Sequence, residues 1–283
     1  MQLCHFGDLG EERAGVVTPA GRIDVGRFVR RFEEGFWADD GVRRLEQWFK
    51  ERGHECPRVP TEARVAAALL TPSKIVCVGR NYRDHAAESG ADSPEEPLLF
   101  LKSQSAIVGP NDDLVLPRGS KKTDWEVELG VVIGRPARYV ERPSALGHVA
   151  GFVLFNDVSE RAFQKERGGQ WEKGKSADSF APVGPYVCSA DALSATDLRL
   201  WLELNGTLMQ DDRTSSMIFD VATLVSYVSE FMTLNPGDLI STGTPSGVGA
   251  GQKPPRYLRP GDVIRSGIEG LGESRRRVIA FVR

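Results

Sequence analysis

The chain has 283 residues, of which 40% are hydrophobic and 27% are charged, so its composition is that of a folded protein and excludes an intrinsically disordered one. The 36 basic and 39 acidic residues leave a net charge of −3, which gives no reason to expect a nucleic-acid partner. No apolar run approaches the roughly 20 residues that a membrane-spanning helix needs, so no membrane partner is expected either.

The N-terminus and the cysteines both indicate a cytoplasmic protein. The first residues have no basic start, no apolar stretch and no cleavage site, and therefore do not resemble a signal peptide. The cysteines are scattered along the chain, at Cys4, Cys56, Cys77 and Cys188, without a C-x-x-C pair. We expect them to be reduced thiols in the cytoplasm.

Residues 1–70 are predicted to form a small N-terminal domain that contains both strands and helices. Residues 14–25 favour two short strands around a Pro/Gly turn. Residues 25–53 have apolar side chains at roughly helical spacing, and the pattern is interrupted near Asp39 and Gly41, which predicts two short helices. A connector with two prolines, residues 54–64, then leads to a second domain over residues 71–283.

The second domain is predicted to be dominated by β-strands. It begins with a buried strand at residues 73–79, a short helix at residues 81–90 and a polar, proline-containing loop at residues 91–97 that we expect to be mobile. Asn205-Gly206 within an alternating apolar pattern predicts a β-hairpin. One amphipathic helix is expected over residues 215–234. Further β-rich runs occupy residues 97–109, 125–134, 151–157, 198–210, 238–244, 262–272 and 275–283.

Three acids, Asp124, Glu126 and Glu128, stand at alternate positions where one of these apolar runs begins. On a strand they would share one face, where buried carboxylates repel each other. Either that face is solvated at the edge of a sheet, or a bound cation compensates the charge. Oxygen ligands alone suit a hard divalent ion, Mg²⁺ first and then Mn²⁺ or Ca²⁺.

A fourth acid, Asp157, follows a second apolar run. Asp157 and Glu160 have the spacing of a helix capping box, which is the simpler interpretation of this pair by itself. Beside Glu126 and Glu128, however, an acid at the tip of a buried strand completes a three-carboxylate metal site, and we favour this second interpretation. The absence of His and Cys near these acids in the sequence disfavours zinc.

Candidate catalytic and substrate-binding residues occur in three further segments. His85 and Glu88 share a helical face, which suits either a surface ion pair or a general base oriented by an acid. Arg161 and Gln164 share another helical face, and Lys175 lies in a glycine-flanked loop.

The Gly/Ser/Thr-rich loop at residues 236–251 is a fourth such segment. Its backbone N–H groups and Thr244 are suited to holding a carboxylate. The loop lacks the pattern of a nucleotide-binding P-loop, so we do not expect a nucleotide there.

Six segments, taken in this order, closely resemble the fumarylacetoacetate hydrolase family. They are residues 74–88, 122–134, 156–164, 174–185, 205–210 and 236–249. The resemblance covers roughly residues 72–283. The chain is most similar to bacterial members that have a small additional N-terminal domain, including acylpyruvate hydrolases and 2,4-diketo-3-deoxy-sugar-acid hydrolases.

This resemblance implies an α+β fold dominated by β-structure, with a mixed β-sandwich roll as the catalytic domain, and a homodimer. It implies a divalent metal, Mg²⁺ or Mn²⁺, on Glu126, Glu128 and Asp157. Asp124 is not a ligand in this assignment and is expected at the surface or behind the ligands. The catalytic positions implied are His85 and Glu88 on a lid, together with Lys175. The implied substrate contacts are Tyr82, Arg161, Gln164 and Thr244.

The activity implied is hydrolysis of a carbon–carbon bond in a 2,4-diketo acid to pyruvate and a carboxylic acid, through an enolate that the metal stabilises. His85 would deprotonate the attacking water. A sugar-acid-derived substrate is our first expectation, because the chain has the length and extra domain of those hydrolases. Alternatives on the same metal site are an oxaloacetate decarboxylase and an isomerase of an unsaturated diacid. An alternative of another class is a non-catalytic binding protein.

Overall fold

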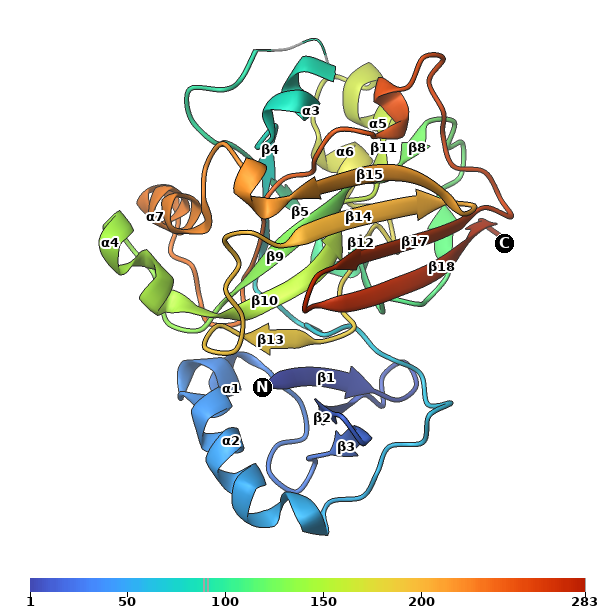
Figure 1. Ribbon diagram of the computed structural model, residues 1–283. Coiled ribbons are helices and arrows are strands. Elements are labelled where there is room, and N and C mark those ends of the chain that lie inside the picture. The colour runs from blue at the N-terminus through green and yellow to red at the C-terminus, as the bar shows by residue number, and fades with distance from the viewer. Residues whose placement is uncertain (89, 91, 283) are drawn as a thin grey trace.

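A nine-stranded mixed sheet forms the centre of the computed structural model, which describes residues 1–88, 90 and 92–282 (Figure 1). The strand order is β3-β2-β1-β13-β10-β9-β16-β4-β5. Strands β16 and β4 run parallel, and all other neighbours in this sheet are antiparallel. In chain order the strands are β1 (Gln2–Phe6), β2 (Arg13–Thr18), β3 (Gly21–Asp24), β4 (Ile75–Gly79), β5 (Leu98–Lys102), β9 (Val127–Ile133), β10 (Val149–Asn156), β13 (Val187–Ser189) and β16 (Leu239–Ser241).

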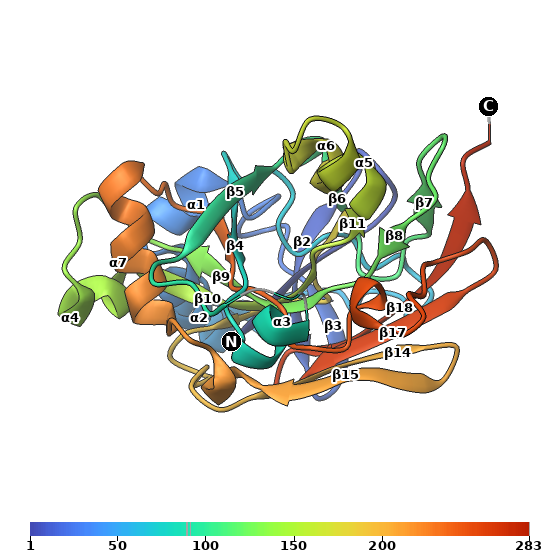
Figure 2. The same cartoon turned by 90° about the horizontal axis from the view of Figure 1, so that it is seen from above.

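A five-stranded sheet packs against this one, so that β14 and β17 contact β9 (Figure 2). Its order is β15-β14-β17-β18-β7. Side chains alternate between buried and more exposed along β14, as expected for a strand with one face on the core. The strands are β7 (Leu114–Leu116), β14 (Arg199–Leu204), β15 (Thr207–Arg213), β17 (Val263–Ile268) and β18 (Gly272–Ala280).

Two short strand pairs, seven α-helices and five single-turn 3-10 helices complete the described part of the fold. The pairs are β6 (Ile107–Val108) with β12 (Ala181–Pro182), and β8 (Thr123–Asp124) with β11 (Ser159–Glu160). The helices are α1 (Glu34–Ala38), α2 (Gly41–Arg52), α3 (Arg83–Glu88), α4 (Arg142–Ala145), α5 (Arg161–Glu166), α6 (Glu172–Lys175) and α7 (Val221–Phe231). None of these helices is both long enough and apolar enough to cross a lipid bilayer. The predicted β-dominated α+β fold is confirmed.

Most local predictions agree with this structure. Asn205 and Gly206 both have positive φ, at 53° and 78°, and form the turn between β14 and β15. Helix α7 is shorter than expected and begins after Asp220, whose side chain accepts the backbone N–H of Thr223 as an N-cap. Residues 92–97 contain no helix or strand, while Ala91 of the loop expected to be mobile lies outside the described residues.

The first 70 residues contain β1, β2, β3, α1 and α2 and lie at one end of the molecule (Figure 1). Strand β1, which the sequence analysis did not identify, pairs with β2 on one side and with β13 on the other. The large sheet is therefore continuous across the expected boundary at residue 70. Whether residues 1–70 form a domain of their own stays a prediction.

His5 on β1 connects three segments of this N-terminal part. Its ring is fully buried, its Nδ1 lies 3.2 Å from the carbonyl oxygen of Ala67, and its Nε2 accepts the backbone N–H of Phe32 at 3.0 Å. This pair of contacts requires one donor and one acceptor nitrogen, which is the neutral ring. Burial lowers the pKa of His5 from 6.5 to about 4.

We predict that His5 makes the stability of the fold depend on pH. Because its pKa is lower in the folded than in the unfolded chain, the neutral ring stabilises the fold above pH 6.5, and this contribution is lost as the pH falls toward 4. The full contribution is about 3 kcal/mol of unfolding free energy. Urea unfolding of the wild type and of His5→Gln at pH 7.5 and pH 4.5 measures it.

The difference in unfolding free energy between the two proteins should be largest at pH 7.5 and should shrink markedly at pH 4.5. A difference that is the same at both pH values would contradict a buried neutral histidine.

Candidate active site

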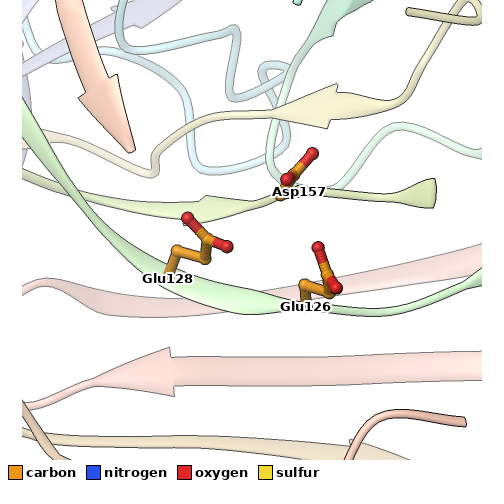
Figure 3. Close-up of side chains that lie close together, drawn as sticks. All are labelled: Glu126, Glu128 and Asp157. Carbon is orange, nitrogen blue, oxygen red and sulfur yellow. The ribbon is translucent and has the colours of Figure 1, made fainter. Parts of the chain in front are cut away.

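Three carboxylates meet where β9 and β10 pair. Glu128 lies on β9, Glu126 directly precedes this strand, and Asp157 directly follows β10. The antiparallel register places Phe155 opposite Glu128, and the backbone N–H of Asp157 donates to the carbonyl oxygen of Glu126 at 2.8 Å. One oxygen of each acid lies within 4.8 Å of the other two, and Figure 3 shows both glutamates directed toward the side of Asp157.

These carboxylates are not on a solvated edge, which was one of the two interpretations of the sequence. Strand β9 is flanked by β10 and β16 within the large sheet, and the three acids are 4%, 2% and 1% exposed. Buried carboxylates at this separation repel each other strongly unless positive charge compensates them. The solvated edge is therefore excluded, and the bound cation of the second interpretation stays a prediction.

Three buried basic side chains supply part of that compensation. Lys175 Nζ lies 2.6 Å from Glu126 Oε2 and also contacts Asp157 Oδ2. Lys102 Nζ lies 2.6 Å from Asp157 Oδ1, and Arg161 Nη2 lies 2.6 Å from Glu126 Oε1. Burial opposes ionisation of Glu126, but Arg161 and Lys175 outweigh it and lower the pKa of this carboxyl well below its usual range.

Glu128 has no basic partner among the residues that the structure describes. Its carboxylate accepts hydrogen bonds from the hydroxyl of Ser241 and from the backbone N–H of Gly243. Burial raises its pKa well above the usual value, and the charges of Asp157 and Glu126 raise it further. The ionised form of Glu128 therefore needs a further positive charge.

The donor set fits a hard divalent cation. The buried charges around the cluster are four carboxylates, Asp124, Glu126, Glu128 and Asp157, and three cations, Lys102, Arg161 and Lys175. The balance is thus one negative charge in excess when all are ionised. Carboxylate oxygens are the ligands that Mg²⁺ and Mn²⁺ prefer, and neither His nor Cys belongs to the group.

Asp124 is not at the surface, so that part of the expectation for it is wrong. It lies on β8 rather than on the strand of Glu128, and its side chain is fully buried. Its carboxylate accepts the Nε–H of Arg161 at 2.9 Å and the backbone N–H groups of Gly249 and Ala250 at 2.6 and 3.0 Å. Asp124 therefore fixes Arg161 and anchors the glycine-rich loop beside the carboxylate cluster.

His85 and Glu88 face each other on α3, as the sequence predicts. Nδ1 of His85 lies 3.4 Å from Oε2 of Glu88, whose carboxylate also accepts the backbone N–H of Gly247 at 3.0 Å. Glycine at position 251 permits this approach, because a Cβ there would lie 2.1 Å from Cδ of Glu88. Glu88 is thus held by the glycine-rich loop beside the imidazole of His85.

One cavity of about 200 Å³ connects the carboxylate cluster with His85 and Glu88. Most of the residues singled out from the sequence line it. The structure does not place Tyr82 there: this residue is 1% exposed and its hydroxyl has no partner among the described residues. The singled-out residues on its wall are Glu126, Glu128, Asp157, His85, Glu88, Arg161, Gln164, Lys175 and Thr244. Their individual roles stay predictions.

Two buried residues at the site were missed. Lys102 is the last residue of β5. A lysine at the end of an apolar strand is the sequence feature that could have identified it as a site residue. Gln210 holds the loop around Thr244, because its Nε2 donates to Thr244 Oγ1 at 2.8 Å and its Oε1 accepts the backbone N–H of Val127 at 3.0 Å. Gln210 ends the segment 205–210 that carries the family resemblance, but the sequence analysis assigned it no role.

We predict that removing the charge of Lys102 destabilises the fold in the absence of metal. The variant Lys102→Met leaves one oxygen of Asp157 buried without its cation, which costs about 3 to 5 kcal/mol of unfolding free energy. Urea unfolding in EDTA measures this loss, and Lys122→Met, which removes the exposed ion pair of Lys122 with Glu166, is the matched control. Equal losses in the two variants would show that Lys102 does not compensate buried charge.

Comparison with known proteins agrees with this geometry. Residues 74–279 match the family model described as Fumarylacetoacetate (FAA) hydrolase C-terminal. A 2,4-didehydro-3-deoxy-L-rhamnonate hydrolase from Sphingomonas sp. (strain SKA58) is 47% identical, and the alignment covers 98% of this chain and 96% of that protein.

Two solved structures are also similar over their whole length. A fumarylacetoacetate hydrolase from Exiguobacterium antarcticum superimposes with a TM-score of 0.85 at 37% identity, covering 99% of this chain and 100% of that one. A maleylpyruvate hydrolase from Sphingobium sp. SYK-6, in complex with manganese(II) and pyruvate, does so with a TM-score of 0.82 at 28% identity, covering 100% of both chains. The chain described here belongs to the fumarylacetoacetate hydrolase family.

Proposed function

We propose that this protein hydrolyses a carbon–carbon bond of a 2,4-diketo acid and releases pyruvate and a carboxylic acid. The observation that carries the proposal is that the buried carboxylate cluster and the His85–Glu88 pair open into one cavity. A cation site supplies an electrophile and the pair supplies a base, which are the two requirements of this reaction. The similar hydrolases of diketo-deoxy-rhamnonate and maleylpyruvate support the same class of substrate.

Glu126, Glu128 and Asp157 would hold Mg²⁺ or Mn²⁺. When bound, the cation supplies Lewis-acid polarisation of a 2-keto acid and stabilises the negative charge that cleavage leaves on its keto oxygen. Lys175, whose Nζ already bridges Glu126 and Asp157, adds positive charge at the same point. Arg161 is held by Asp124 and Glu126 at the cavity wall and contributes a second fixed cation.

His85 would accept the proton of the attacking water. Glu88 keeps the imidazole in place and stabilises its protonated form. The hydroxide adds to the C4 carbonyl, the C3–C4 bond breaks, and its electron pair passes to the pyruvate half as an enolate. Protonation at C3 completes pyruvate, while the acyl half leaves as the carboxylic acid with the oxygen of the water.

A coupled assay of pyruvate release from a panel of 2,4-diketo acids tests this proposal. We expect release with Mg²⁺ or Mn²⁺ and its loss in EDTA, because the proposed cation would supply the Lewis acid that this cleavage needs. The panel should include oxaloacetate, since decarboxylation on the same site needs no water. If oxaloacetate is consumed in a metal-dependent way while no diketo acid releases pyruvate, the protein is a decarboxylase and the proposed hydrolase function is wrong.

We predict that His85→Ala separates catalysis from cation binding. Loss of a general base lowers kcat roughly 10²- to 10⁴-fold. The carboxylate ligands stay intact, so Mn²⁺ titration by electron paramagnetic resonance should give the wild-type affinity. The exposed His54 provides the control variant, His54→Ala, which should leave both quantities unchanged.

Glu128→Gln is the opposite case and should lose Mn²⁺ binding. Wild-type turnover in His85→Ala would sink the assignment of the base without affecting that of the cation site.

A further inference from the structure

The backbone between the two glutamates of the carboxylate cluster is bound by side chains. Val127 separates Glu126 from Glu128. Its backbone N–H donates to Oε1 of Gln210 at 3.0 Å, and its carbonyl oxygen accepts the hydroxyl of Thr244 at 2.9 Å. Within a sheet, groups of this kind are bound by the backbone of a neighbouring strand. Gln210 and Thr244 therefore take the place of a strand at this point.

Strand β16 would supply those partners if it were longer. It pairs with β9 in antiparallel register and ends at Ser241, which lies opposite Gly130. Gly243 then has a φ of 95°, a conformation that favours glycine, and its backbone N–H donates to the carboxylate of Glu128 at 2.8 Å. The chain thus leaves β9 before it reaches Val127, and the departing backbone binds one of the three acids.

The side-chain amide of Gln210 is fully engaged. Besides accepting from Val127, it donates through Nε2 to Thr244 Oγ1 at 2.8 Å and to the carbonyl oxygen of Pro245 at 2.9 Å. These partners offer one donor and two acceptors, so they determine which end of the amide is the oxygen. Gln210 is 1% exposed, and an unpaired amide or an unpaired N–H of Val127 at this depth would destabilise the fold.

A β-bulge directs Gln210 to this position. The pairing of β15 with β14 shifts next to Gln210, so that Met209 is the extra residue on β15. Along β15, all of which the structure describes, Gln210 is the single buried residue, whereas Leu208 is 49% exposed. Bulges re-aim side chains, and burial of a glutamine in place of a leucine adds little apolar contact. The burial of Gln210 is therefore explained by its polar contacts.

The position of Val127 decides where both glutamates point. Their side chains leave the backbone one residue to either side of it, and one oxygen of each lies within 4.8 Å of the other and of Asp157. The backbone N–H of Glu126 is held as well, because it donates to Asn156 Oδ1 at 3.1 Å. Mg²⁺ demands near-ideal geometry of its ligands, so a shift of this backbone would weaken its binding.

We propose that Gln210 is a positioning residue that holds Glu126 and Glu128 in the geometry a divalent cation requires. Gln210 does not belong to the described lining of the cavity and acts through Val127 and Thr244. It completes the sheet where β16 turns away to bind Glu128. This inference rests on the cation site of the proposed function and assigns a role to a residue outside the ligand set.

Mn²⁺ binding by Gln210→Met tests the proposal. Methionine has about the length of glutamine but cannot replace its hydrogen bonds. We expect the dissociation constant for Mn²⁺, measured by electron paramagnetic resonance, to rise roughly 10- to 100-fold, as it does when partners behind metal ligands are removed. The spectrum of the bound ion should also change, because its ligands shift.

Thr214 provides a matched control away from the site. It is buried, and its hydroxyl accepts the backbone N–H of Leu198 and donates to the carbonyl oxygen of Ala195, both at 2.8 Å. Thr214→Val removes these equivalent bonds and should leave both the Mn²⁺ affinity and the spectrum unchanged. A wild-type affinity and spectrum in Gln210→Met, or an equal loss of affinity in Thr214→Val, would overturn the proposal.

Amide hydrogen exchange of Val127 in EDTA is a readout that needs no metal. Its protection should fall at least about tenfold in Gln210→Met, the effect of one lost hydrogen bond, and should be unchanged in Thr214→Val. If Gln210→Met does not fold, the isosteric Thr244→Val takes its place. That variant removes the hydroxyl that Gln210 and Val127 share, so the same losses of protection and of Mn²⁺ affinity are expected.

The two proposals fail in different ways. A wild type that does not bind Mn²⁺ would refute the cation site of the proposed function, and hydrogen exchange would then decide the role of Gln210. A loss of protection confined to Val127 and its neighbours in Gln210→Met would support the positioning of Glu126 and Glu128. Unchanged protection would overturn it.

Discussion

Mutual repulsion among Glu126, Glu128 and Asp157 is the constraint on which the rest of this site depends. Pairing of β9 with β10 brings the three carboxylates within 4.8 Å in the middle of a sheet, where their side chains are almost fully buried. A fold with this feature is stable only if positive charge surrounds it. The buried cations Lys102 and Lys175 meet that need in part, and a divalent cation would complete it.

The same constraint organises the elements around the sheet. Helix α5 brings Arg161 to Glu126, and Asp124 on β8 holds the other side of its guanidinium group. The backbone N–H groups that bind Asp124 belong to the glycine-rich loop, and this loop also binds Glu88 beside His85. The carboxylate cluster and the proposed base are thus both anchored to the same glycine-rich loop.

Sequence reasoning found the parts of this site that depend on local spacing. Glu126 and Glu128 stand two apart at a strand, and His85 and Glu88 three apart on a helix, so their proximity follows from backbone geometry. Sequence reasoning failed for contacts that depend on pairing between distant segments of the chain. The insertion of β1 beside β13 and the arrival of Lys102 at Asp157, 55 residues away, leave no periodic pattern in the chain. The alternate spacing of Asp124, Glu126 and Glu128 was also misleading. Asp124 is the last residue of β8 and does not lie on β9 with Glu128.

The central claim is that a divalent cation binds among the three carboxylates, and crystallography with Mn²⁺ tests it most directly. Data collected at the manganese absorption edge should show one strong anomalous peak, bonded to an oxygen each from Glu126, Glu128 and Asp157. The ammonium group of Lys175 should lie beside that peak rather than between the acids. No peak at this position, with Lys175 still bridging Glu126 and Asp157, would contradict the account.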